Sequence, residues 1–289
     1  MEKIQSALAK ARAARHGKTV DPDSALSGPG RKLREGSTVD RTDDASPAVP
    51  PDVAAAWLAL SPLTLKPKTI AQNRIVALQD GRDRTSIDMM RTRVLQQMRD
   101  NDWRRLAITS PTAGCGKSTI ATSLAFSLQR LPDKRTLLLE LDLRRPSLKK
   151  MLGIDSPLNF SRVLEGSEAF SENALAYGAN LAVAASERPS HDSTELLSGH
   201  NIPEVLEDIE RTYAPDVMIF DMPPMLANDD VMAFARHVDC VLLVAGAEAT
   251  TIKEIDICEQ DLASQTNVMG VILNKCRYLG PEHSYSYYE

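Results

Sequence analysis

The sequence predicts an α/β fold in which a mainly parallel sheet is flanked by helices. Three observations support this prediction: apolar strands alternate with amphipathic segments from residue 75 onward, a glycine-rich loop joins one such strand to a helix, and 43% of the 289 residues are hydrophobic. A chain of this length and composition can bury one sizeable core. We therefore expect one folded domain over residues 75–277 with a flexible segment on either side.

The first 74 residues are expected to lie outside that domain. Residues 1–20 place apolar side chains at helical spacing opposite a basic face, which predicts a short amphipathic helix. The helix is expected to be a docking element or a frayed end, and its basic face could be weakly attracted to anionic lipid. Residues 21–74 carry seven of the seventeen prolines among scattered Ser, Asp and Gly. Because such a composition cannot offset its own ordering entropy, this stretch is predicted to be a mostly disordered linker.

The remaining sequence gives a regular series of strands and helices. The predicted strands are 106–109, 136–141, 181–185, 217–221, 240–245 and 269–273, and the predicted helices are 117–130, 202–213, 229–237 and 251–264. Ligands of open parallel sheets bind at the carboxyl ends of the strands, so we expect the functional site at that edge.

The loop at residues 110–119 reads Ser-Pro-Thr-Ala-Gly-Cys-Gly-Lys-Ser-Thr and is predicted to bind phosphate. Its glycines let backbone N–H groups surround phosphate oxygens, Lys117 balances their charge, and the Ser118 hydroxyl can bind Mg²⁺. The strict consensus has Gly where Pro111 stands, and a chance match in a surface turn is the alternative. The motif predicts a P-loop NTPase-type enzyme whose nucleotide-binding residues are Thr112, Ala113, Gly114, Cys115, Gly116, Lys117, Ser118 and Thr119.

Two predicted strands end in carboxylates. An apolar strand carries Asp221 to the phosphate side of the sheet, where it could hold magnesium directly or through water; a strand-end Asp with no role is the alternative. Glu140 and Asp142 alternate along their strand, so both can point to one face. There they could orient metal, water or an incoming hydroxyl group.

Four of the six tyrosines lie in the last twelve residues: Tyr278, Tyr285, Tyr287 and Tyr288. Residues 281–289 contain no aliphatic side chain and no periodicity, which predicts a mobile tail whose rings are not needed in a core. A phosphate-binding enzyme with its own tyrosine cluster suggests self-phosphorylation. An interaction tail that docks on a partner is the alternative.

Composition excludes several other classes of protein. The net charge of −5 argues against a nucleic-acid binder. The longest apolar stretch, residues 53–60, is far shorter than the roughly 20 residues that span a bilayer, and the N-terminus has no signal-peptide core, so we expect a cytoplasmic protein. The four cysteines form no Cys-x-x-Cys pair, which fits a reducing compartment.

The cysteines differ in their expected surroundings. Cys240, Cys258 and Cys276 are expected to be ordinary buried residues. Cys115 stands at a helix N-terminus, which favours a thiolate and hence oxidation. Redox control is one hypothesis for Cys115, and a variable position that tolerates Cys is the other.

Taken together, the motifs resemble those of the bacterial tyrosine kinases, or BY-kinases, which regulate capsule and exopolysaccharide synthesis. The resemblance covers residues 80–289 and rests on the loop at 110–119, Asp-Leu-Arg-Arg-Pro-Ser-Leu at 142–148, Asp-Met-Pro-Pro at 221–224 and the terminal tyrosines. It implies ATP and Mg²⁺ as cofactors and contact between Asn274 and adenine. The implied catalytic residues are Lys117, Glu140, Asp142 and Asp221, and the implied metal ligands are Ser118, Asp142 and Asp221.

The same resemblance implies a set of partners. The tail tyrosines Tyr278, Tyr285, Tyr287 and Tyr288 would be phosphorylated by a neighbouring subunit of a homo-oligomer. A Wzz-like membrane polysaccharide copolymerase would activate the protein and recruit it to the inner face of the cell membrane, and a cognate tyrosine phosphatase would act on it.

Two departures from the family pattern affect these expectations. Glu140 stands where the family usually has an Asp that assists the attacking hydroxyl, so we expect transfer that is slower but not lost. In Asp88-Met-Met-Arg91-Thr-Arg93 the last Arg of a Glu-x-x-Arg-x-x-Arg motif is displaced by one residue. This rotates it about 100° around a helix and puts ring assembly through that contact in doubt; a solvated helical face is the alternative.

Two other functions stay open. Partition and division-site ATPases share the loop, but they carry a signature lysine five positions before its main lysine, where this chain has Thr112. A non-catalytic, nucleotide-bound adaptor of the polysaccharide machinery is the third possibility.

Overall fold

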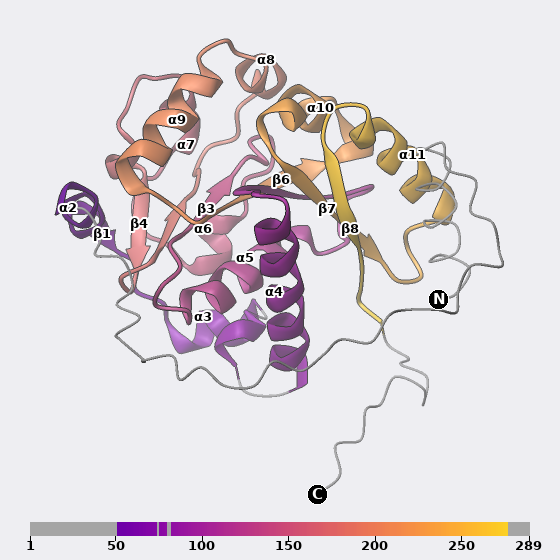
Figure 1. Cartoon of the computed structure of the whole chain (residues 1–289), viewed down its shortest axis with the longest axis horizontal. Helices are drawn as coiled ribbons and strands as arrows, with labels where there is room; N and C mark the ends of the chain where they lie inside the picture. The colour runs from indigo at the N-terminus through magenta and orange to yellow at the C-terminus, as the bar shows by residue number, and fades with distance from the viewer. Residues whose placement is uncertain (1–50, 74, 80–81, 277–289) are drawn as a thin grey trace, which may run out of the picture. The chain divides into compact units, whose positions relative to one another are not determined.

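An eight-stranded sheet forms the centre of the described part of the chain (Figure 1). The structure is a computed structural model that describes residues 51–73, 75–79 and 82–276. The predicted helix over residues 1–20 and the tyrosines of the tail lie outside these described residues. The predicted phosphate-binding loop lies within them.

The sheet is mainly parallel. Its strands follow the order β1-β4-β5-β3-β6-β2-β7-β8, and β4 with β5 is the antiparallel pair. The strands are β1 Ser61–Pro62, β2 Arg105–Ser110, β3 Thr136–Glu140, β4 Ala174–Tyr177, β5 Leu181–Ala184, β6 Val217–Pro224, β7 Cys240–Gly246 and β8 Asn267–Asn274. The predicted α/β fold with a mainly parallel sheet is confirmed, and all six predicted strands form. The neighbours β3, β6 and β2 end together at the edge where the site is expected.

Helices cover both faces of the sheet because successive residues of its buried strands point into two different cores. Leu137 and Leu139 of β3 belong to the core that includes residues of α9 and α10, whereas Leu138 belongs to the core that includes residues of α4 and α5. The helices are α2 Pro51–Ala59, α3 Pro67–Gln72, α4 Arg82–Asp100, α5 Lys117–Gln129, α6 Leu148–Leu152, α7 Phe160–Leu164, α8 Ser193–Leu197, α9 Ile202–Tyr213, α10 Asp230–Phe234 and α11 Ile252–Ala263. The four predicted helices form, although a short 3-10 turn follows α10.

The prediction of a disordered linker over residues 21–74 is wrong for residues 51–73. Helix α2 buries Val53 and Trp57, which lie four residues apart on one face, and the Trp57 Nε1–H donates a hydrogen bond to the Tyr213 carbonyl at 2.8 Å. Proline content misled the prediction, because Pro67 opens α3, a position where a helix needs no N–H donor. The folded region therefore includes residues that composition assigned to the linker.

Burial of the cysteines was predicted correctly in part. Cys115, Cys240 and Cys258 are buried, whereas Cys276 is exposed just beyond the end of β8. Cys276 is exposed because it lies two residues beyond Asn274, the last residue of β8, and is not packed in the sheet. None of the helices in the described ranges is both long and apolar enough to cross a bilayer.

Candidate nucleotide-binding site

The predicted phosphate-binding loop lies between β2 and α5, at the carboxyl edge of the sheet. Gly114 and Gly116 adopt φ angles of +84° and +95°, in the left-handed region that favours glycine. A Cβ atom at Gly116 would lie 2.3 Å from Asn274 Nδ2, so the Asn274 side chain would have to move away from the loop. Helix α5 begins at Lys117 immediately after this turn, so its free N–H groups are available to an anion held by the loop.

Lys117 connects the loop to both acidic strands. Its Nζ donates to Asp142 Oδ2 at 2.7 Å and to Ser118 Oγ at 3.3 Å, and it lies 3.6 Å from Asp221 Oδ1. Burial alone would lower the pKa of Lys117, but the attraction of Asp221 and Asp142 outweighs it and raises the pKa. Lys117 is therefore a firmly protonated cation at the centre of the predicted site.

Asp221 is fully buried on the central strand β6, between Ile108 of β2 and Glu140 of β3. Neither of its carboxyl oxygens lies within ordinary hydrogen-bond distance of a donor among the described residues, although Oδ1 forms an ion pair with Lys117 at 3.6 Å. Burial raises the pKa of Asp221, and the nearby Lys117 charge opposes that rise. A buried carboxylate without hydrogen bonds is rare and destabilising, so Asp221 has the character of a ligand for a charged group.

The residues around Asp221 suit Mg²⁺. Ser118, Asp142 and Asp221 offer hard oxygen donors, and proteins usually hold Mg²⁺ through one or two carboxylates together with substrate phosphates and water. The unpartnered oxygens of Asp221 are the observation of this structure that fits such an ion. Within the described ranges, no group of three or more His, Cys, Asp and Glu side chains is placed to hold a metal ion.

Glu140 occupies a structural position that differs from the prediction. Its Oε1 accepts hydrogen bonds from the backbone N–H groups of Ser147 and of Leu148, the latter at 2.7 Å, and its Oε2 accepts one from Ser186 N–H at 2.8 Å. Burial raises the pKa of Glu140 to about 7. Because both carboxyl oxygens are bound to backbone amides, the structure does not support the predicted role for Glu140 in orienting an incoming hydroxyl group.

The remaining predicted ligands surround the loop. Asn274 Nδ2 donates to the Cys115 carbonyl at 2.9 Å, which ties the end of β8 to the loop; its contact with adenine stays a prediction. Ala113 and Gly114 are exposed at the rim, and Thr112 is half-buried. Thr119 lies in the first turn of α5 and lines an adjoining cavity.

Cys115 is buried inside the loop. Its thiol lies 3.2 Å from the Thr112 carbonyl and 3.4 Å from Thr250 Oγ1. Burial alone would raise the pKa of this thiol, but its hydrogen bonds with Thr250 and Thr112 outweigh that effect and lower the pKa. Redox control through Cys115 stays a hypothesis.

Comparison with known proteins places this geometry in a family. A family model described as ParA, NUBPL iron-transfer P-loop NTPase, matches residues 103–288, well over half of the chain. The chain belongs to this ParA family of P-loop NTPases. The loop, Lys117 and the two strand-end aspartates all lie within the matched residues.

The sequence of this ParA-family chain is similar to those of bacterial tyrosine kinases. It is 28% identical over 216 residues to the putative tyrosine-protein kinase AmsA of Erwinia amylovora, covering 73% of this chain and 29% of AmsA, and 28% identical over 191 residues to the tyrosine-protein kinase etk of Escherichia coli K12, covering 65% and 26%. The chain thus spans less than a third of the length of these curated relatives.

Solved structures show the same likeness. The kinase domain of Escherichia coli ETK superposes with a TM-score of 0.61 at 27% identity, covering 70% of this chain and 79% of that domain. The BceF tyrosine kinase domain gives a TM-score of 0.61 at 25% identity, covering 74% and 90%. The resemblance to bacterial tyrosine kinases predicted from the motifs is confirmed.

One network in this ParA-family member was missed by sequence reasoning. Arg144, two residues beyond Asp142, donates from Nε to Asp230 Oδ2 at 3.2 Å and from Nη2 to Thr194 Oγ1 at 2.9 Å. Asp230 is fully buried and also accepts a hydrogen bond from Ser193 Oγ at 2.7 Å. The network ties the segment after Asp142 to α8 and α10. The only sequence signal was that Arg144 belongs to the quoted motif at residues 142–148.

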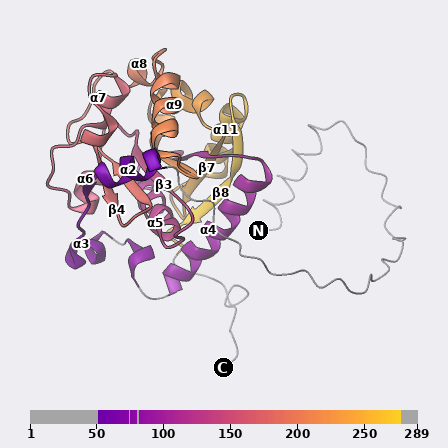
Figure 2. The same ribbon diagram turned by 60° about the vertical axis from the view of Figure 1, so that its left-hand side comes forward.

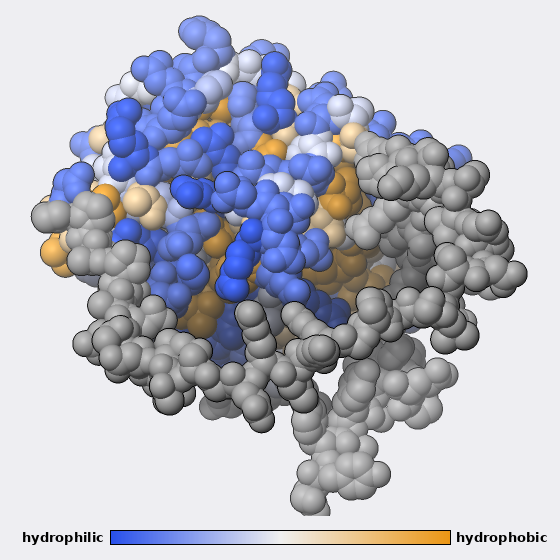
Figure 3. Space-filling view, in the orientation of Figure 1, coloured by the Kyte–Doolittle hydropathy of each residue, from blue (hydrophilic) through white to orange (hydrophobic). Residues whose placement is uncertain are grey.

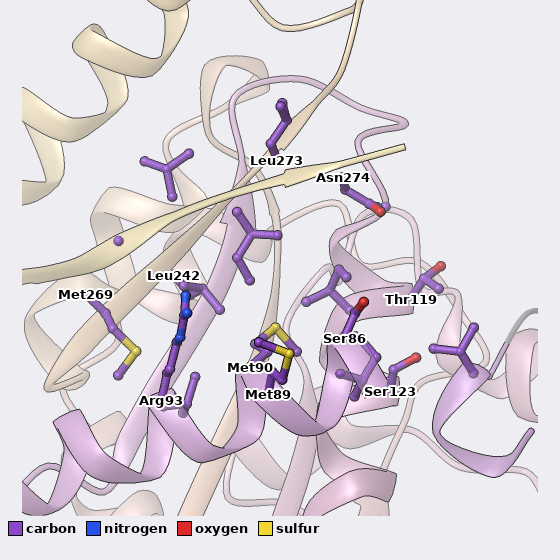
Figure 4. A pocket seen from close by; sticks show the side chains of 18 of the residues that line it. Ser86, Met89, Met90, Arg93, Thr119, Ser123, Leu242, Met269, Leu273 and Asn274 are labelled. Carbon is purple, nitrogen blue, oxygen red and sulfur yellow. The ribbon is translucent and has the colours of Figure 1, made fainter. Parts of the chain in front are cut away.

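Helix α4 uses part of the altered arginine motif inside the chain. Asp88 accepts hydrogen bonds from Arg130 and from Ser127 Oγ, and Arg91 donates to the Ser127 carbonyl at 2.8 Å. These contacts hold α4 against α5. Arg93 points elsewhere, into a cavity of about 970 Å³ that lies between α4, α5 and β8 and reaches Gly116 (Figure 4).

Proposed function

We propose that this chain is an ATP-dependent protein-tyrosine kinase that phosphorylates its own terminal tyrosines. The observation that carries the proposal is Asp221, a buried carboxylate without a hydrogen-bond partner beside Lys117 on the phosphate-binding loop. The similarity to tyrosine-protein kinases in sequence and fold supports this proposal over other P-loop chemistry. Tyr278, Tyr285, Tyr287 and Tyr288 are the proposed acceptors.

The residues of the site divide the work of phosphoryl transfer. The loop amides and Lys117 would hold the phosphates of ATP, and Ser118, Asp142 and Asp221 would hold Mg²⁺. When bound, the metal neutralises charge that develops on the transferred phosphoryl group. Such transfer depends more on positioning and charge than on a strong base, so it does not require Glu140 as a base.

The cellular setting is proposed from the same similarity. The names of two relatives, a putative kinase in the cps region of Klebsiella pneumoniae and the putative kinase EpsB of Ralstonia solanacearum, fit a setting in surface-polysaccharide synthesis. We propose phosphorylation in trans within a homo-oligomer, in the cytoplasm, activation at the membrane by a polysaccharide copolymerase, and reversal by a tyrosine phosphatase.

The experiment that tests the activity is phosphotyrosine formation in purified full chain with ATP and Mg²⁺, with and without the cytoplasmic segment of a candidate copolymerase. Lys117→Met and a truncation after Arg277 are the controls, and both should remove the signal. Mixing full-length Lys117→Met with the truncated active chain tests the trans route. Phosphotyrosine on the Lys117→Met chain in that mixture would support it, because that chain cannot phosphorylate itself.

A switch ATPase is the second candidate, favoured by membership in the ParA family. Thr112 argues against it, because the signature lysine of partition and division-site ATPases is missing at that position. ATP hydrolysis without phosphotyrosine, with the copolymerase segment present, would favour the switch. ATP binding without any turnover would favour a nucleotide-bound adaptor.

A further inference from the structure

The cavity between α4 and β8 forms an apolar groove at the edge of the sheet, which we call the α4–β8 groove. Met89, Met90 and Arg93 of α4 form one wall, and Met269 and Leu273 belong to the strand β8 opposite (Figure 4). Met89 is 52% exposed, so the α4 wall carries a large hydrophobic side chain in contact with solvent; Met269 of β8 points toward α4, whereas Leu273 points to the other side of the strand (Figure 4). Figure 3 shows hydrophobic residues gathered beside α4 in this region. Apolar side chains that gather in a hollow of this size are typical of ligand and peptide sites.

The groove exists because β8 is the last strand of the sheet. Helix α11 packs on β8, and in both views α4 lies alongside β8 (Figure 1 and Figure 2). Side chains of α4 and β8 leave the space between them unfilled, with a volume of about 970 Å³. That volume is at the upper end of the range for pockets that bury a ligand of drug size. The groove can therefore accommodate several side chains of a peptide segment.

The chain supplies such a segment at the mouth of the groove. Lys275 and Cys276 line the groove, and thirteen residues follow them in the sequence. Thirteen residues reach at most about 45 Å when fully extended. A segment tethered at the rim of a groove is held at a high local concentration there, so even weak contacts suffice to occupy it.

The residue types of the α4–β8 groove and of the tail, residues 278–289, are chemically complementary. Residues 278–289 contain four tyrosines, and from residue 281 onward the tyrosine rings are the only large apolar groups. Methionine sulfurs such as those of Met89 and Met90 make favourable contacts with aromatic rings. Residues 278–289 also include Glu282 and Glu289 but no Lys or Arg.

Two cationic residues of the groove add charge complementarity to the acidic tail. The side chains of Arg93 and Lys275 both line the groove, and neither forms an ion pair with another described residue. Arg91 and Arg130 nearby, by contrast, are held by carbonyl and carboxylate oxygens. An acidic, tyrosine-rich segment would satisfy both the apolar walls and these charges.

We propose that the α4–β8 groove binds the tyrosine-rich tail of the same chain, residues 278–289, in cis. The docked tail places its rings against the methionines and its acidic groups near Arg93 and Lys275. In this state the tail is withheld from a second copy and must leave the groove before it can be phosphorylated in trans. The docking itself needs neither nucleotide nor kinase activity, so its failure and the failure of the proposed function are distinguishable.

The test is an NMR measurement on the full chain labelled with ¹³C at the methionine methyl groups. Ring currents from docked tyrosines should shift the methyl signals of Met89 and Met90 upfield, relative to a full-length variant in which all four tail tyrosines are changed to serine. Single substitutions Met89→Leu and Met90→Leu assign the signals. Met151 of α6 does not line the groove, so its methyl signal is the internal control and should not move.

Three outcomes would overturn the proposal. Groove methyl signals that are identical in the two proteins would show that the tail does not dock. A shift that fades on dilution, or that returns when unlabelled full chain is added to labelled chain truncated after Arg277, would assign the groove to the tail of a second copy. A shift that responds to removal of residues 1–50 but not to the tail tyrosines would assign it to the N-terminal segment.

Discussion

Glu140 and Asp221 are two fully buried carboxylates on neighbouring strands, and they differ in how their oxygens are hydrogen-bonded. They are direct register partners between β3 and β6. Glu140 accepts hydrogen bonds from three backbone N–H groups, whereas Asp221 has no hydrogen-bond partner among the described residues and lies 3.6 Å from Lys117. Similar burial and similar chemistry thus give one satisfied group and one unsatisfied group.

The difference separates structure from function at this edge of the sheet. A satisfied buried carboxylate stabilises the backbone that surrounds it, here the segments at Ser147 and Ser186. An unsatisfied one lowers the stability of the fold, and such groups persist where a ligand completes them. We therefore propose that Glu140 holds the loops of the site and that Asp221 binds the magnesium–nucleotide complex.

The largest expected effect follows from changing Asp221. Asp221→Asn should lower the rate of phosphotyrosine formation about 100-fold or more, because a metal-bound site contributes several kcal/mol of transition-state stabilisation. The same change should leave the melting temperature nearly unchanged, because Asp221 makes no hydrogen bond and Lys117 keeps its ion pair with Asp142 at 2.7 Å. Initial rates and thermal unfolding check both parts. A variant that melts much earlier than wild type would place Asp221 with the structural group instead.

An effect on stability rather than on rate is expected at Glu140. Glu140→Ala should lower the free energy of unfolding by about 4 kcal/mol, because it leaves three buried N–H groups without an acceptor. Denaturant unfolding measures this value. Glu165→Ala is the matched control, since Glu165 is exposed, and it should change stability by less than about 0.5 kcal/mol. Equal losses of unfolding free energy in the two variants would contradict a stabilising role for the hydrogen bonds of Glu140.

The smallest expected effect is a pH dependence of stability. The folded pKa of Glu140, about 7, lies above its ordinary value of 4.5, so the folded state binds the extra proton between these pH values. The stability from this proton is fully present below pH 4.5 and is lost as the pH rises through 7, by at most about 3 kcal/mol. In Glu140→Gln the decline in unfolding free energy between pH 5 and 7.5 should be shallower. An unchanged slope would contradict the shifted pKa.

Sequence reasoning located the part of the site that depends on local spacing. The loop at residues 110–119 lies where a strand meets a helix, and strand-end aspartates converge because parallel strands end at one edge. For that reason Asp142 and Asp221 were expected near Lys117, and the structure brings a carboxyl oxygen of each within 3.6 Å of Lys117 Nζ. The mainly parallel sheet was predictable on the same grounds.

Features that depend on distant partners were not predictable. The contact between Glu140 and Ser186 joins residues 46 positions apart, and alternation along β3 gave no indication of it. Trp57 joins the fold through a hydrogen bond to Tyr213, 156 residues away, so a composition-based linker prediction could not include it. Strand β4 was not predicted either. It is only four residues long, too short for a clear apolar pattern, and it is defined by its antiparallel pairing with β5.

The most direct test of the account is calorimetric binding of ATP with and without Mg²⁺. Wild type and Glu140→Gln should both bind ATP more tightly when Mg²⁺ is present, whereas Asp221→Asn should lose that gain and still bind ATP through the loop and Lys117. Thermal unfolding of each variant confirms that the folded protein is being compared. A full magnesium-dependent gain in Asp221→Asn would contradict the assignment of the unsatisfied carboxylate to the magnesium–nucleotide complex.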